Sequence, residues 1–119
     1  MIQGIVTGDE ARINLTVFGS HALALDAVID TGYTAMLSLP PVLIADLELP
    51  WRTIGRCLLA DGSESIFDVY TAEIEWDGVR RTVLIDEADT SPVVGMTLLK
   101  GFQLSIEVTE RGVVEIVRL

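Results

Sequence analysis

The residues of this 119-residue chain whose types and spacing could do chemistry lie at Asp30-Thr31-Gly32. A mostly apolar run over residues 25–29 leads into Asp30, so its carboxylate would stand at the end of a rigid strand. Gly32 allows a sharp backbone turn that brings N–H groups towards the carboxylate. A carboxyl group held in this way can act as a general acid or base. The alternative interpretation is a turn that only ends the strand.

The elements around this tripeptide are predicted to be mainly β, because apolar and polar residues alternate along most of the chain. Tight turns are expected at Asp61-Gly62-Ser63 and at Asp77-Gly78, where glycine accepts a positive φ. The expected strands cover residues 13–18, 23–29, 54–60, 66–76 and 79–85, followed by a last hairpin over 102–119. We therefore expect a single mainly β domain over residues 1–119, either a barrel or a sandwich.

Two short helices complete the expected fold. Ser38-Leu39-Pro40-Pro41 is typical of a helix start, with Ser38 as the cap and prolines in the first turn, and this helix would end before Pro50. A second helical segment is expected over residues 96–100.

A weak internal symmetry links the tripeptide to a later segment. Val28-Ile29-Asp30-Thr31-Gly32 and Pro92-Val93-Val94-Gly95 are both apolar strand ends that close on glycine and precede a helix. Only the first of them carries a carboxylate.

In order and spacing, three segments together resemble the retropepsin-like (clan AA) aspartic proteases, above all the small bacterial single-lobe members with an aromatic residue after Asp-Thr-Gly. The segments are residues 28–34, 58–63 and 92–99, which are similar to the catalytic loop, the flap hairpin and the second hallmark of that family. The resemblance covers residues 13–108. It implies a closed acid-protease β-barrel with one or two short helices, acting as an aspartic endopeptidase.

The resemblance also implies roles for individual residues. Asp30 would be the catalytic acid and base, the Thr31 hydroxyl would bond across a dimer axis, and Gly32 would bring its backbone close to the substrate. The flap would close over an extended peptide. The residues expected to bind that peptide are Tyr33, Ala60, Asp61, Gly62 and Ser63.

The chemistry of that family requires two carboxyl groups. One activates water while the other, protonated, donates to the substrate carbonyl, and two such groups in contact cannot both be ionised. This chain has a single Asp-Thr-Gly, so the resemblance implies a homodimer with one Asp30 from each subunit. The terminal segments, residues 1–6 and 113–119, would resemble the interleaved strands that join such dimers. No metal or cofactor is expected, and the partner would be a peptide or protein substrate.

Two departures from the viral members point to a different subfamily. Tyr33 stands where those enzymes have a small residue, so its ring would narrow the substrate site. Thr34 and Met96 replace the acidic and basic residues that form a bracing ion pair there.

The amino-acid composition limits the classes of partner that we expect for the protein. Eight basic against eighteen acidic residues give a net charge of −10, which argues against a nucleic-acid binder. No uninterrupted apolar run approaches the ~18 residues of a membrane span, and the first residues lack signal-peptide character. We therefore expect a cytoplasmic protein with no membrane partner.

Four other features are assigned ordinary structural roles. Cys57 is expected to be a small buried hydrophobe, and Trp51 and Trp76 are expected to pack against the barrel. Residues 86–89 spell a helicase tetrapeptide, but the chain has no phosphate-binding loop to accompany it, so a solvated acidic loop is expected there.

Two functions of other classes remain open. The same fold could be a catalytically silent dimer that binds peptides or regulates a partner. It could also be a plain β-barrel assembly subunit in which Asp30-Thr31-Gly32 is only a turn.

Overall fold

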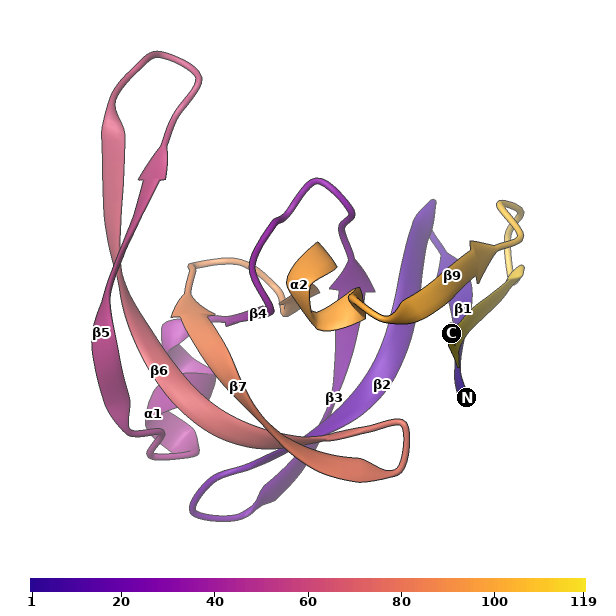
Figure 1. The fold of residues 1–119 in the computed structure, drawn as a ribbon, viewed down its shortest axis with the longest axis horizontal. Coiled ribbons are helices and arrows are strands. Elements are labelled where there is room, and N and C mark those ends of the chain that lie inside the picture. Colours follow the sequence, from indigo (N-terminus) through magenta and orange to yellow (C-terminus); the bar gives the residue numbers. More distant parts are fainter.

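Most of the segments in which apolar and polar residues alternate form β-strands. A computed structural model describes residues 1–119, and it is mainly β, with ten strands in one sheet and two short helices (Figure 1). The strands are β1 (Ile2–Thr7), β2 (Glu10–Phe18), β3 (Ala22–Ile29), β4 (Leu37–Leu39), β5 (Trp51–Leu58), β6 (Glu64–Trp76), β7 (Val79–Glu87), β8 (Val93–Val94), β9 (Phe102–Ile106) and β10 (Val113–Arg118). The helices are α1 (Pro41–Asp46) and α2 (Met96–Leu99). Neither helix has the length and apolar character needed to cross a membrane.

The strands follow the order β5-β6-β7-β4-β8-β3-β2-β1-β10-β9. β2 also pairs with β6 at Val17↔Ile74 and Phe18↔Glu73, so the hydrogen-bonded neighbours β6, β7, β4, β8, β3 and β2 return on themselves. The two apolar strand ends that share an internal symmetry, on β3 and β8, lie side by side in parallel (Val28↔Val93, Ile29↔Val94).

The core lies inside this curved sheet. Strand alternation sends every second residue inward, so Ile13, Leu15 and Val17 on β2 are buried while their neighbours are not. Ile44 of α1 and Leu47 just after it join the same core cluster. Burial of these apolar side chains is the main stabilising contribution to the fold.

The hairpins are confirmed. Asp77 and Gly78 have φ values of 53° and 78°, the left-handed region that a two-residue hairpin turn between right-twisted strands requires. The hairpin of β2 and β3 delivers Asp30, and β7 returns from the turn along β6.

The prediction of Ser38 as a helix cap is wrong. Ser38 lies in β4, between β7 and β8, and helix α1 begins at Pro41 with Pro40 at the cap position and no side-chain cap bond. The local sequence Ser-Leu-Pro-Pro is typical of a helix start. Ser38 instead lies in a strand because β4 pairs with β7 and β8, which are distant in the sequence.

The terminal segments form strands, as their apolar character suggested. Within this chain β1 and β10 pair with each other, from Ile2↔Ile116 to Ile5↔Val113. Interleaving with a second chain would require this pairing to be exchanged. The free edge on this side of the sheet is β9, next to β10.

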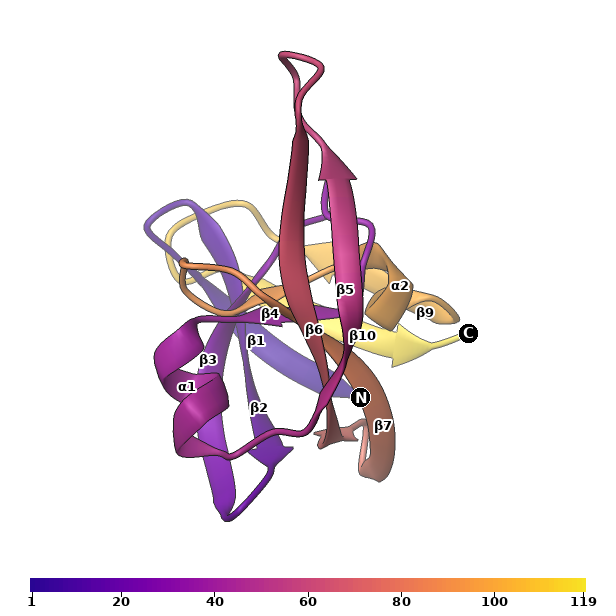
Figure 2. The same ribbon diagram turned by 90° about the vertical axis from the view of Figure 1, so that its left-hand side faces the viewer.

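The end of the β5–β6 hairpin stands clear of the rest of the molecule in both views (Figures 1 and 2), whereas β6 pairs with β7 from Val69 to Trp76. Two predictions fail on β5, an edge strand that pairs only with β6. Cys57 is exposed on β5, and Trp51 is 57% exposed with its indole N–H donating to Asp68 at 3.0 Å. Trp76, at the other end of β6, is buried as expected and meets Phe102 edge-to-face at 6.0 Å.

Candidate functional site

Asp30 is held where β3 ends against β8. Its backbone N–H donates to the carbonyl oxygen of Val94 at 2.9 Å, which extends the parallel pairing by one bond. The N–H of Gly32 donates to Asp30 Oδ1 at 2.8 Å. The side chain of Asp30 is therefore oriented by the turn that follows it, as the sequence predicts, and the residue itself is exposed.

The loop after Asp30 is braced by the start of α2. The N–H groups of Met96 and Thr97 donate to the carbonyl oxygens of Tyr33 (2.8 Å) and Ala35 (3.2 Å), and the Thr97 hydroxyl donates to the carbonyl of Thr34. These three bonds support the loop without a charged pair at Thr34 and Met96.

Gly95 permits this close approach. A Cβ placed on Gly95 would lie 2.3 Å from the carbonyl oxygen of Ala35 and 2.7 Å from the Tyr33 ring. Any larger residue would push the loop away, because backbone atoms cannot yield as a flexible side chain can.

The Tyr33 hydroxyl donates to Asp86 Oδ2 at 2.5 Å. Burial raises the pKa of the Tyr33 hydroxyl, and the neighbouring carboxylate raises it further. Burial also raises the pKa of Asp86, against the opposing effect of the hydrogen bond from Tyr33. The hydrogen bond between Tyr33 and Asp86 fixes the orientation of the Tyr33 ring. The prediction of a solvated loop over residues 86–89 is wrong at its first two residues. β7 continues to Glu87, so Asp86 and Glu87 are half-buried strand residues.

A cleft of about 430 Å³ opens beside Asp30, within the range of roughly 300–1,000 Å³ that ligand sites span. Its walls come from the loop after Asp30, from β4 and the end of β7, and from the lower part of the β5–β6 hairpin. The lining residues that carry chemistry or bulk are Asp30, Tyr33, Ser38, Phe67, Asp86 and Glu87.

The predicted site residues divide into three groups. Asp30, Gly32 and Tyr33 line this cleft together, whereas Thr31 lines two other hollows. Ala60, Asp61, Gly62 and Ser63 form the exposed tip of the hairpin and do not line the cleft; Arg56, Cys57 and Phe67 line it from the hairpin instead.

The hairpin tip is a defined turn. Asp61 Oδ1 accepts from the N–H of Ser63 at 2.9 Å and from its hydroxyl at 2.5 Å, and these bonds lower the pKa of Asp61. Gly62 takes a φ of 87°. The local chemistry of the predicted turn is thus confirmed, while its position leaves it away from Asp30 in the single chain.

Two further hollows flank Thr31. One, of about 560 Å³, also holds Asp30 and is lined by the apolar side chains of Val6, Ala11, Ile106 and Val108 among others. The other, of about 550 Å³, adds Met96, Leu99, Phe102 and Leu104 to Thr31. Thr31 therefore stands between two depressions beside the free edge β9; the first also contains Asp9 and Glu10, and the second is the more apolar.

Sequence reasoning missed Ser38, Asp86 and Phe67 as residues of the site. The β-alternation was the available signal for Phe67, which lies on the same face of its hairpin as Cys57. For Ser38 and Asp86 the informative fact is their pairing across β4 and β7, which local sequence does not reveal.

No protein-family model matches this chain, and no curated protein does either.

Proposed function

We propose that the protein is an aspartic endopeptidase of the retropepsin-like type, active as a homodimer in which the two Asp30 carboxyl groups form the catalytic pair. The pairing of β2 with β6, which returns the sheet on itself, supports a closed acid-protease barrel. The parallel contact of the two glycine-ended strands supports the same fold.

One observation carries the proposal. The Asp30 carboxyl group is oriented by the Gly32 N–H at the edge of a cleft, on a loop that α2 braces, and residues of the β5–β6 hairpin line the same cleft. Rigid placement of an exposed carboxylate beside a cleft is what acid–base catalysis on a bound peptide needs. A turn that merely ended a strand would not require the bracing bonds from α2.

The surroundings of Thr31 support the dimer. Hollows on either side of this exposed residue next to Asp30, with apolar side chains from β9 in both, offer a surface for a second copy. A two-fold axis passing beside Thr31 would bring each Asp30 to its counterpart and complete the site.

The proposed mechanism follows from the pair. The ionised carboxyl group accepts a proton from a water molecule, which attacks the peptide carbonyl carbon. The protonated carboxyl group donates to the carbonyl oxygen, and proton transfer to the leaving nitrogen then breaks the C–N bond. Closure of the hairpin would exclude other water molecules.

The experiment compares peptide hydrolysis by the wild type, Asp30→Asn and Asp89→Asn, with liquid chromatography and mass spectrometry of a mixed peptide library at pH 4 to 7. Asp89 is an exposed acid that lines none of the three hollows beside Asp30 and Thr31, so its variant matches the change in charge. We expect Asp30→Asn to lose activity by at least about 1,000-fold and Asp89→Asn to keep it. Hydrolysis that survives in Asp30→Asn would refute the proposal. Peptide binding without hydrolysis in the wild type would favour the silent binding module.

A further inference from the structure

The floor of the cleft beside Asp30 contains a serine hydroxyl that the hydrolysis does not use. Ser38 is the only polar or charged residue in the buried core of the chain, at 5% exposure, and it lines the cleft. None of the side-chain hydrogen bonds within the chain involves its hydroxyl. Ser38 is buried as a residue, but its oxygen is not closed off from the cleft, so a ligand can reach it there.

The sheet register sets this hydroxyl beside a carboxylate. On β4, Leu37 and Leu39 are fully buried in the core, so Ser38 between them faces the other side of the sheet. Its cross-strand neighbours are Asp86 on β7 and Val93 on β8, and both also line the cleft. Ser38 and Asp86 therefore share one face and one hollow.

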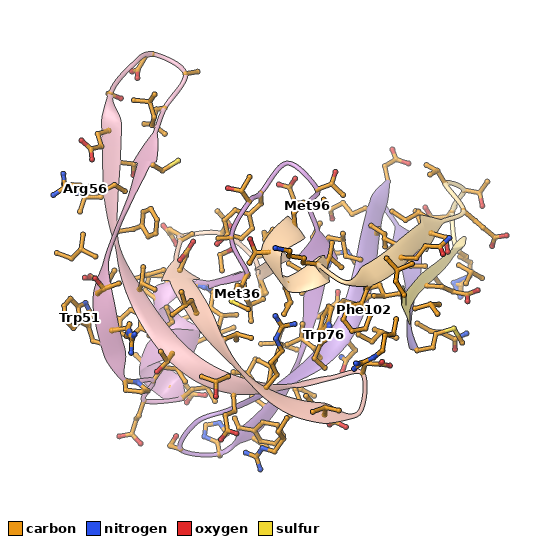
Figure 3. The ribbon with its side chains drawn as sticks, in the orientation of Figure 1. Met36, Trp51, Arg56, Trp76, Met96 and Phe102 are labelled. Atoms are coloured by element: carbon orange, nitrogen blue, oxygen red, sulfur yellow. The ribbon has the colours of Figure 1, made fainter.

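The charges in the cleft do not balance. Asp30 and Asp86 line it against the single cation Arg56. Glu87, paired with Leu39, alternates to the other face of β7 and interacts with the Tyr70 hydroxyl. The Arg56 guanidinium lies 3.3 Å from Glu64 on the neighbouring strand, and in Figure 3 the side chain extends outward, away from the rest of the fold. The half-buried carboxylate of Asp86 thus receives one hydrogen bond, from Tyr33, and no cation from its own chain.

We propose that Ser38 and Asp86 form a subsite for the lysine or arginine side chain of a bound peptide, beside Asp30. An ionised carboxylate only accepts hydrogen bonds, whereas ammonium and guanidinium groups only donate them, so the two are complementary. The Ser38 hydroxyl adds an acceptor at the floor, and Tyr33 orients the carboxylate. The inference rests on the proposed function only in taking a peptide as the ligand.

Binding to an inactive protein tests it without relying on catalysis. The probes are two octapeptide libraries with capped ends, identical except for lysine or the uncharged norleucine at one fixed position, the others being drawn from uncharged residues. Retention is measured on immobilised Asp30→Asn protein, alone and combined with Asp86→Asn, Ser38→Ala or Glu75→Gln. Glu75 is exposed and distant from the cleft along β6, so its variant controls for the general attraction of a protein of net charge −10.

We expect lysine peptides to be retained about tenfold more than norleucine peptides, a charge-assisted contact of ordinary strength. Asp86→Asn, which can still accept from Tyr33, should remove most of this ratio, Ser38→Ala should reduce it, and Glu75→Gln should leave it within about twofold. An equal retention of both libraries, or a ratio unaffected by Asp86→Asn, would overturn the inference.

The two proposals fail separately. Hydrolysis by the wild type with no preference for lysine would overturn the subsite and leave the endopeptidase. An Asp86-dependent preference in a protein that hydrolyses nothing would sustain the subsite and refute the endopeptidase. Retention of neither library would overturn the subsite.

Discussion

At the scale of single residues, three carboxyl groups differ in their exposure and in the group that donates a hydrogen bond to each. Asp30 is exposed and held by a backbone N–H, Asp61 is exposed and held by Ser63, and Asp86 is half-buried and held by a tyrosine. Hydrogen bonds lower the pKa of Asp61, whereas burial raises that of Asp86. The same side chain therefore contributes to the pH dependence of stability with opposite signs at two positions.

Asp86→Asn tests that sign. Because the pKa of Asp86 is raised in the folded protein, its contribution is most favourable below the ordinary carboxyl pKa and is lost as pH rises through the raised value. The variant does not titrate, so we expect it to gain stability relative to the wild type between pH 3 and 7. The gain should stay below about 1 kcal/mol because the group is partly solvated. Urea unfolding at several pH values measures it.

Asp61→Asn is the matched comparison. The lowered pKa of Asp61 contributes stability above the ordinary carboxyl pKa and loses it as pH falls. Relative to the wild type, this variant should therefore lose stability as pH rises from 3 to 7, opposite to Asp86→Asn. Trends of the same sign for the two variants would contradict the assignment of burial as the cause at Asp86.

At the scale of elements, the β5–β6 hairpin contains one tight packing contact, between Gly55 and Phe67. A Cβ added to Gly55 would lie 2.3 Å from the Phe67 ring, so the ring lies directly over this glycine across the hairpin. Phe67 lines the cleft, and the glycine lets it do so while β5 and β6 keep their pairing.

Gly55→Ala should displace the ring more than the backbone, because a side chain can rotate away. We expect peptide hydrolysis to fall by about tenfold while the unfolding free energy changes by no more than about 1 kcal/mol. Parallel measurements of kcat/KM and urea unfolding check this. Gly78→Ala is the control: at φ 78° with open space around it, it should cost about 1 kcal/mol and leave kcat/KM unchanged. An unchanged kcat/KM in Gly55→Ala would show that the ring has no part in the site.

The same elements show what the sequence could predict. Local signals sufficed for the hairpin turns, for the strand that ends at Asp30 and for the glycine that precedes α2. They failed at Ser38 and at Asp86, because both positions are decided by β4 lying between β7 and β8, a pairing of segments far apart in the chain. They failed at Trp51 and Cys57 because both lie on β5, an edge strand that pairs only with β6, where their side chains remain exposed.

At the scale of the whole molecule, the exposed surface around Thr31 is the interface of the proposed dimer. Met96 is 47% exposed and lines the hollow between Thr31 and β9. In a two-fold dimer centred beside Thr31, each substitution occurs twice and close to its own copy. A charge introduced there is therefore repeated across the interface.

Met96→Glu should separate the dimer while leaving the chain folded, because Met96 side-chain burial contributes little to the core and like charges facing each other cost several kcal/mol. Activity at micromolar concentration should fall by at least about 100-fold, since each monomer retains only one Asp30. Sedimentation velocity, circular dichroism and peptide hydrolysis measure the three effects. Val42→Glu, at a residue 70% exposed on α1, makes the same change on an unrelated surface and should leave the dimer and its activity intact. A fully active monomer of Met96→Glu would mean that one carboxyl group suffices, and the two-subunit site would have to be abandoned.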